Sequence, residues 1–178
     1  GLPETLSSEK DILGEDEKKT LYKILNEVLK DLEGYRKNEG AELGKDINLR
    51  IDLIESHLQS AVKIDPERNK KIEEKLRSAL EDLKQEVDTN RFEQELIFYL
   101  EKFDITEEKV RLKNHLNYFR EVMENDFPNG KKLGFISQEI GREINTIGSK
   151  ANHTELQKIV VQMKDELEKI KEQLLNVL

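Results

Sequence analysis

The chain has 178 residues, of which 38% are charged and 35% hydrophobic, and its formal net charge at pH 7 is −8. It contains no cysteine, which excludes disulfides, thiolate metal sites and cysteine nucleophiles. No segment approaches the roughly 20 apolar residues that a membrane span needs, so we expect no membrane partner. The negative charge argues against a non-specific nucleic-acid binder, whose affinity depends on Lys and Arg meeting phosphates.

The chain opens with a loop-like segment over residues 1–14 and then becomes helical from about residue 15. Apolar residues recur every three or four positions in a heptad-like order, namely Leu21, Leu25, Val28, Leu32, Tyr35, Leu43, Ile47, Ile51, Ile54, Leu58 and Val62. This spacing predicts a helix that approaches the length of the whole 15–64 segment.

Glycine and proline punctuate this long pattern. Gly34, Gly40 and Gly44 each predict a bend, a break or a close contact, because Gly costs roughly 1 kcal/mol relative to Ala inside a helix. Pro66 is expected to end the first helix, with a second helix running over residues 66–87. Residues 15–87 together are predicted to form a long helical arm.

Four further helices are predicted over residues 88–103, 104–125, 131–149 and 154–178. Asp104 followed by Glu107 fits an N-cap pattern, and Thr154 with Gln157 fits a capping box. The last helix carries an apolar seam that suits another helix, in this chain or in a neighbouring subunit. We therefore predict an all-α fold, an elongated and oligomeric helical bundle with long coiled-coil-like helices, in which residues 88–178 form the bundle.

The segment from Gly130 to Lys150 is the most informative part of the sequence. Its apolar residues predict one buried stripe, made of Leu133, Ile136, Ile140, Ile144 and Ile147. Two polar rows run beside that stripe, the first with Gln138, Arg142, Asn145 and Ser149 and the second with Glu139, Glu143, Thr146 and Lys150. A solvated face more often carries only Lys and Glu, so we expect these polar groups to border a site.

Other predicted helices supply polar groups that lean towards the core. Residues 88–103 offer Arg91 and Glu95, and residues 104–125 offer Glu108, Arg111, His115 and Tyr118 along one face. Facing helices of a bundle can hold metals with inward Glu and His, and an oxygen-rich set with one imidazole suits Mg²⁺ or Mn²⁺. The paired Glu-x-x-His spacing of di-iron bundles is absent from the sequence.

Each of these residues also has a structural interpretation. A Glu beside a core stripe is usually a rim residue paired with Lys or Arg, and His115 fits a structural histidine equally well. Arg142 with Glu139 or Glu143 also fits an intrahelical ion pair. Gly134, Gly141 and Gly148, seven residues apart, indicate a close helix contact more than a ligand cradle. The spacing alone predicts a helical bundle with a polar inner face that is able to hold a metal.

Several short motifs in the sequence also resemble those of a known protein family. They are Gly130-Lys131-Lys132-Leu133 before Phe135, then Gln138-Glu139, Arg142-Glu143, Asn145-Thr146 and Ser149-Lys150, and upstream Asp104-Ile105, Glu107-Glu108, Arg111-Leu112, His115-Leu116 and Arg91 with Gln94-Glu95. In these motifs the chain resembles the C-terminal region of the YicC family of bacterial proteins, described as metal-dependent endoribonucleases. The resemblance covers the chain from about residue 20.

The resemblance implies a cytoplasmic endoribonuclease that hydrolyses RNA phosphodiester bonds with a divalent cation, Mn²⁺ or Mg²⁺, and that acts on RNA and not DNA. The residues expected to bind the metal are Glu95, Glu108, His115, Glu139 and Glu143. Glu108, His115 and Glu143 are expected to act in acid–base catalysis, since an imidazole changes charge near neutral pH. Arg91, Arg111, Arg142 and Lys150 are expected to bind the RNA phosphate.

Family members carry a further N-terminal domain and form ring-like hexamers, so residues 1–14 are expected to be a loop or linker from a domain missing here. Two alternatives to the nuclease follow. The chain can be a non-catalytic oligomeric adaptor that holds RNA or a decay enzyme, with its inner polar residues forming a buried network. It can also be an assembly and lid portion that is inactive without its missing domain.

Overall fold

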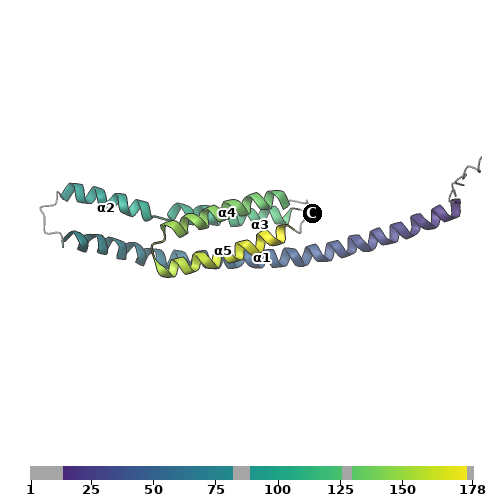
Figure 1. Cartoon of the computed structure of the whole chain (residues 1–178), viewed down its shortest axis with the longest axis horizontal. Helices are drawn as coiled ribbons and strands as arrows, with labels where there is room; N and C mark the ends of the chain where they lie inside the picture. The colour runs from purple at the N-terminus through teal and green to yellow at the C-terminus, as the bar shows by residue number, and fades with distance from the viewer. Residues whose placement is uncertain (1–13, 82–88, 126–129, 176–178) are drawn as a thin grey trace, which may run out of the picture. The chain divides into compact units, whose positions relative to one another are not determined.

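The structure, a computed structural model, describes residues 14–81, 89–125 and 130–175, without the side chains of residues 80, 81 and 89–92. Within these ranges every regular element is a helix (Figure 1). The five helices are α1 (Glu15–Glu81), α2 (Thr89–Phe103), α3 (Thr106–Glu124), α4 (Gly130–Lys150) and α5 (Thr154–Leu174). The predicted all-α fold is confirmed. None of the described helices is long and apolar enough to cross a membrane.

Contacts within the chain divide it into two units, Gly1–Glu42 and Leu43–Leu178. The described part of the first unit belongs to α1 apart from Gly14. The second unit contains the remainder of α1 and the other four helices, and it holds the whole buried core.

Helix α1 differs from its prediction at the glycines and at the proline. It is unbroken at Gly34, Gly40 and Gly44, and a Cβ added at any of them would meet nothing within 4 Å. The prediction that Pro66 ends the helix is wrong, because Pro66 lies inside α1. Proline removes one hydrogen bond to the carbonyl four residues earlier. Both Pro66 and Val62 are exposed, so water can satisfy that carbonyl.

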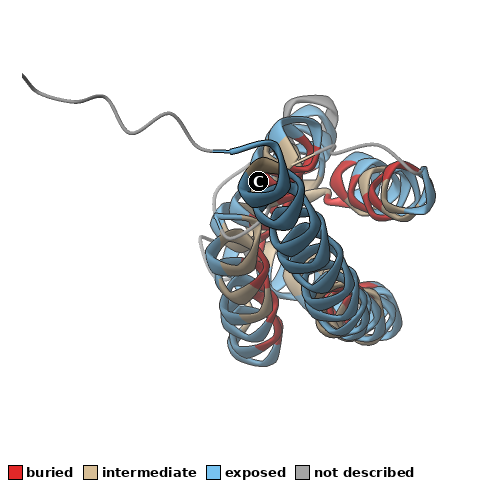
Figure 2. Cartoon of the chain, turned by 90° about the vertical axis from the view of Figure 1, so that its right-hand side faces the viewer, coloured by how far each residue is buried: buried red, intermediate tan, exposed pale blue. Residues whose placement is uncertain are grey.

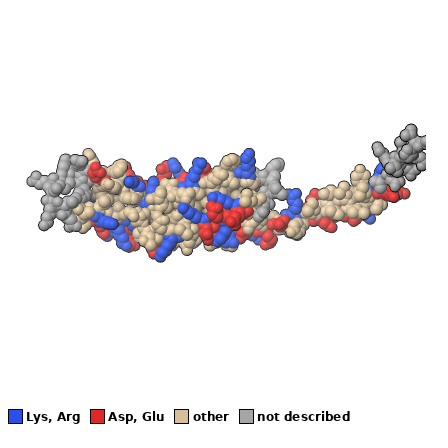
Figure 3. Space-filling model, viewed as in Figure 1, with Lys and Arg blue, Asp and Glu red and all other residues tan. Residues whose placement is uncertain are grey.

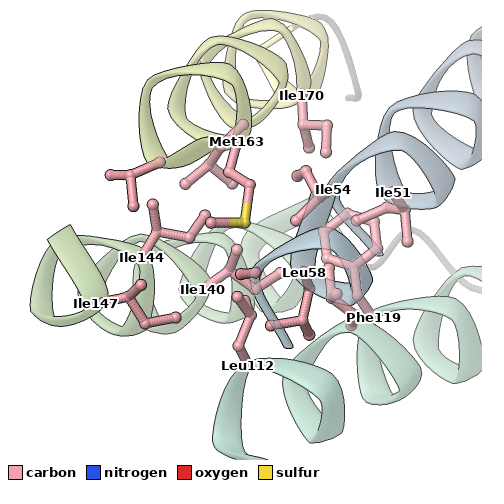
Figure 4. Close-up of a cluster of buried hydrophobic side chains, with 14 of the residues drawn as sticks. Ile51, Ile54, Leu58, Leu112, Phe119, Ile140, Ile144, Ile147, Met163 and Ile170 are labelled. Carbon is pink, nitrogen blue, oxygen red and sulfur yellow. The ribbon is translucent and has the colours of Figure 1, made fainter. Parts of the chain in front are cut away.

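The core of the second unit lies between α1, α3, α4 and α5. Ile51, Ile54 and Leu58 of α1 point towards side chains from the other three helices (Figure 4). In each of these helices the buried residues lie on the inward face (Figure 2). All five members of the predicted α4 stripe are buried, as are Leu156, Val160, Met163, Leu167 and Ile170 of α5. The described part of the apolar seam predicted for the last helix is therefore covered within this chain, where α5 packs on α4. Val177, the last predicted member of this seam, lies outside the described residues.

A buried arginine joins four helices of the second unit. Arg68 of α1 is 1% exposed, and its guanidinium donates to the carbonyl of Phe103 at 2.7 Å and to that of Lys150 at 3.1 Å. These are the last residues of α2 and α4, whose final carbonyls have no partner within their own helix. Asp65 accepts from Arg68 Nε at 2.9 Å and also from Lys109 of α3. One buried ion pair thus holds two helix ends and a third helix in place.

Two of the three glycines spaced seven residues apart in α4 make the close contact that their spacing predicts. A Cβ on Gly148 would lie 3.0 Å from Val160 Cγ1, and one on Gly141 would lie 3.2 Å from Leu167 Cδ2. Val160 and Leu167 belong to α5, so these glycines let α4 and α5 approach each other. Gly134 has open space beside it and takes no part in this contact.

The glycines give a matched pair of substitutions. Gly134→Ala is expected to raise the free energy of unfolding by roughly 0.5–1 kcal/mol, because alanine costs less conformational entropy in a helix and meets no neighbour here. Gly148→Ala is expected to give a smaller gain or a loss, since the new methyl group would press on the buried Val160. Urea unfolding followed by circular dichroism measures both. An equal gain for both variants would show that α5 does not lie close to Gly148.

Candidate functional site on the seam between α3 and α4

The packing of α4 against α3 brings two of the residues that the sequence singled out, Glu108 and Lys150, into contact, and it places His115 and Glu143 at a second level. Lys150 Nζ donates to Glu108 Oε1 at 2.7 Å, which joins the end of α4 to the start of α3, so the two helices are antiparallel. His115 and Glu143 each lie seven residues, or about two turns, inward from that contact and so occupy matching levels of the pair. We call Glu108, His115, Glu143 and Lys150 the α3–α4 seam.

The seam lies at the edge of the core. Glu108 is 6% exposed and Glu143 is 8% exposed, whereas His115 and Lys150 are half-buried. Among the described residues, the only other buried charged side chains are Asp65 and Arg68. Carboxylates are rarely buried this deeply unless they are paired, so the two seam acids need a physical reason to be there.

The seam carboxylates are not fully satisfied by protein partners. Glu108 Oε2 is buried and accepts no hydrogen bond. No described residue donates to the Glu143 carboxylate either. A buried polar atom without a partner costs about 1–3 kcal/mol, and more when it is charged. The seam therefore has free acceptor capacity that a water molecule, a proton or a cation would satisfy.

Asp104 lies at the Glu108 end of the seam. Its Oδ1 accepts from Thr106 Oγ1 at 2.7 Å and from the Thr106 N–H at 3.2 Å. Burial raises the pKa of Asp104, but these hydrogen bonds and the nearby Lys109 and Lys150 outweigh burial and leave the pKa below its ordinary value. The N-cap residue of α3 is Ile105, which makes no side-chain cap. Asp104, the predicted N-cap, lies one residue before it.

The other candidates whose side chains the structure describes make no interaction with the seam. Glu139 pairs with Arg142 at 2.9 Å within α4, and Arg111 pairs with Glu107 within α3. Glu95 is exposed on α2. Arg91 belongs to α2, but its side chain lies outside the described residues.

The sequence analysis missed the buried groups that hold the residues next to the seam in place. Arg68 binds the carbonyl of Lys150, and Asp65 holds Lys109, the neighbour of Glu108. The only signal was an acid and a base three residues apart in a helix, which is common on exposed surfaces. Over the described ranges, no three His, Asp or Glu side chains gather closely enough to hold a metal ion by themselves.

Comparison with known proteins identifies the family of this chain. The family model described as "Endoribonuclease YicC-like, C-terminal" matches residues 61–178, about two-thirds of the chain. The chain belongs to the YicC-like family. The matched region includes Asp65, Arg68 and the whole α3–α4 seam, so the buried ion pair and the seam both lie within the YicC-like C-terminal region.

Two curated relatives extend the match along the chain. A protein of Clostridioides difficile named "Probable endoribonuclease YicC" is 36% identical over 170 residues, which cover 92% of this chain and 58% of the relative. A protein of Haemophilus influenzae with the same name is 28% identical over 177 residues, which cover 99% of this chain and 60% of the relative. The chain therefore spans about three-fifths of the length of these YicC relatives.

Proposed function

We propose that this chain carries the catalytic seam of a metal-dependent endoribonuclease that hydrolyses RNA phosphodiester bonds. The observation that carries the proposal is Glu108, whose buried Oε2 has no partner while its Oε1 is held by Lys150. The free carboxylate oxygen can bind a cation, and the neighbouring ammonium group can bind a phosphate. The names of the two relatives support RNA as the substrate.

A divalent cation, Mn²⁺ or Mg²⁺, fits the donor set of the seam. Mg²⁺ is usually bound through one or two carboxylates, with waters and substrate phosphates completing its shell. Glu108 supplies one such carboxylate through its unpartnered Oε2, so a cluster of three protein ligands is not needed. The other proposed ligands, His115, Glu143, Glu139 and Glu95, do not gather with Glu108 in the described ranges. We therefore do not assign them to the same ion. The bound cation would polarise the phosphate and lower the pKa of a bound water.

The protein groups would then bind the RNA and move protons. Lys150 contacts a phosphate oxygen and offsets the charge that grows there. Glu143, which no described residue pairs, accepts a proton from the attacking water. His115 donates a proton to the leaving oxygen as the general acid. Arg91, Arg111 and Arg142 would hold flanking phosphates, and both Arg111 and Arg142 are exposed enough to do so.

A gel assay with fluorescently labelled RNA tests this function. Cleavage is expected with Mn²⁺ or Mg²⁺ and is expected to stop when EDTA removes the cation. Binding without cleavage under every cation would contradict the nuclease and support the alternative of an RNA-binding or RNA-decay adaptor. Neither binding nor cleavage would support the assembly portion that needs its further domain.

We also propose that the protein is a homo-oligomer, a hexamer when full-length. The first unit supports this proposal, because its described helix is exposed along an apolar stripe with the heptad order predicted from the sequence. The stripe contains Leu21, Tyr22, Ile24, Leu25, Val28, Leu29, Leu32 and Tyr35, all of them exposed. An apolar face of this kind is normally covered by another helix.

The mass of the full-length protein in solution tests the oligomer. Multi-angle light scattering is expected to give six copies per particle, and a particle of one copy would contradict the proposal. We further propose that the protein acts in the cytoplasm on RNA and not on DNA, in keeping with its family.

A further inference from the structure

Beside the seam, Tyr118 of α3 and Lys132 of α4 form an exposed pair. Lys132 Nζ lies 5.0 Å from the centre of the Tyr118 ring, within the range of a cation–π interaction. Tyr118 is 41% exposed. It lies three residues beyond His115, about 4.5 Å further along the helix axis, so the pair borders the His115 level of the seam.

This pair contributes little to the core, so its position calls for another reason. A core tyrosine would turn its ring inward, whereas Tyr118 leaves much of its surface to solvent. Phe135, one turn after Lys132 on α4, is also exposed, at 58%. Exposed aromatic rings close to a lysine are what proteins use to stack nucleobases of a single strand.

The charge of the surface favours a single strand over a duplex. Lys and Arg are interspersed with Asp and Glu on the face of the second unit shown in Figure 3, and they form no continuous basic band there. A duplex hides the faces of its bases and is held mainly through its phosphates by basic groups. A single strand offers its base faces to aromatic side chains, and each stacked base adds binding energy that does not depend on basic groups.

We infer that Tyr118 stacks an unpaired base of the RNA while Lys132 contacts the adjacent phosphate, which makes single-stranded segments the substrate of the seam. The inference rests on the proposed nuclease function and adds a specificity residue to it. Tyr118 is a positioning residue here, because it contacts a base next to the cleaved bond and not the reacting atoms.

Fluorescence anisotropy of RNA binding tests this inference without relying on cleavage. The probe is a short fluorescein-labelled oligouridylate, compared with the same strand annealed to its complement at one salt concentration. Tyr118→Leu, which keeps an apolar side chain without a ring, is expected to weaken binding of the single strand by roughly 5- to 150-fold, the range given by loss of one stacked base. Tyr118→Phe is expected to keep wild-type affinity.

A control variant and a kinetic measurement complete the test. Tyr99→Leu alters another exposed tyrosine, on α2, and is expected to leave affinity unchanged. Where cleavage is measured, Tyr118→Leu is expected to raise KM and leave kcat close to wild type, as loss of uniform binding does. The inference fails if wild type and Tyr118→Leu bind the single strand with equal affinity, or if wild type prefers the duplex. Either result would leave the proposed nuclease function standing. A wild type that binds neither RNA would overturn the proposed function as well.

Discussion

Replacing Glu143 by Gln is expected to slow RNA cleavage by roughly 100- to 10,000-fold, the contribution typical of a general acid or base. The amide keeps the size of the side chain but can neither take a proton from water nor attract a cation. Glu143 is buried and accepts no hydrogen bond from the described residues, so the change breaks no ion pair of the fold. Helix content and particle mass are expected to stay those of the wild type.

Single-turnover cleavage of labelled RNA, with circular dichroism and light scattering on the same samples, measures this effect. Glu168→Gln is a matched control, because Glu168 is an exposed acid of α5 that pairs with Lys171 of the same helix, at 2.8 Å. It is expected to cleave like the wild type. Cleavage by Glu143→Gln at the rate of Glu168→Gln would remove Glu143 from the proposed mechanism.

Arg68→Met is expected to destabilise the second unit strongly. Removing one partner of a buried ion pair typically costs roughly 3–5 kcal/mol, because the other charge stays buried. Here the change also strips a donor from the carbonyls of Phe103 and Lys150, at the ends of α2 and α4. Asp65 would keep only Lys109 as a charged partner.

Thermal and urea unfolding measure this loss, which corresponds to a fall in Tm of roughly 6–20 °C for a chain of this length. Arg77→Met is the comparison, because Arg77 is an exposed arginine of the same helix that pairs with Glu73 one turn away. Surface substitutions of this kind usually change stability by less than about 0.5 kcal/mol. Similar losses for both variants would mean that Arg68 does not fasten the helix ends.

The bundle could be predicted from sequence because its signal is periodic. Ile140, Ile144 and Ile147 follow the spacing of one helical face, and all three are fully buried where that spacing predicts. Pro66 misled the prediction, since a proline usually ends a helix and nothing local shows that its effect is tolerated. Gly134, Gly141 and Gly148 share one spacing, yet only the last two face α5, because sequence spacing does not reveal where a neighbouring helix lies.

For the candidate site, the sequence could predict only which residues share a face of the same helix. Glu108 with His115, and Glu143 with Lys150, are seven residues apart, so each pair was expected on one face. That Lys150 meets Glu108 depends on how α4 packs on α3, which no local pattern encodes. Arg68 was missed for the same reason, because its partner carbonyls lie 35 and 82 residues away in the chain.

Anomalous diffraction from crystals of the protein soaked in Mn²⁺ tests the central claim most directly, because it locates the ion without depending on activity. We expect a manganese peak at coordination distance from Glu108 Oε2, at the Lys150 end of the α3–α4 seam. Manganese bound only elsewhere, with Glu108 Oε2 still unpaired, would contradict a metal-dependent nuclease centred on this seam.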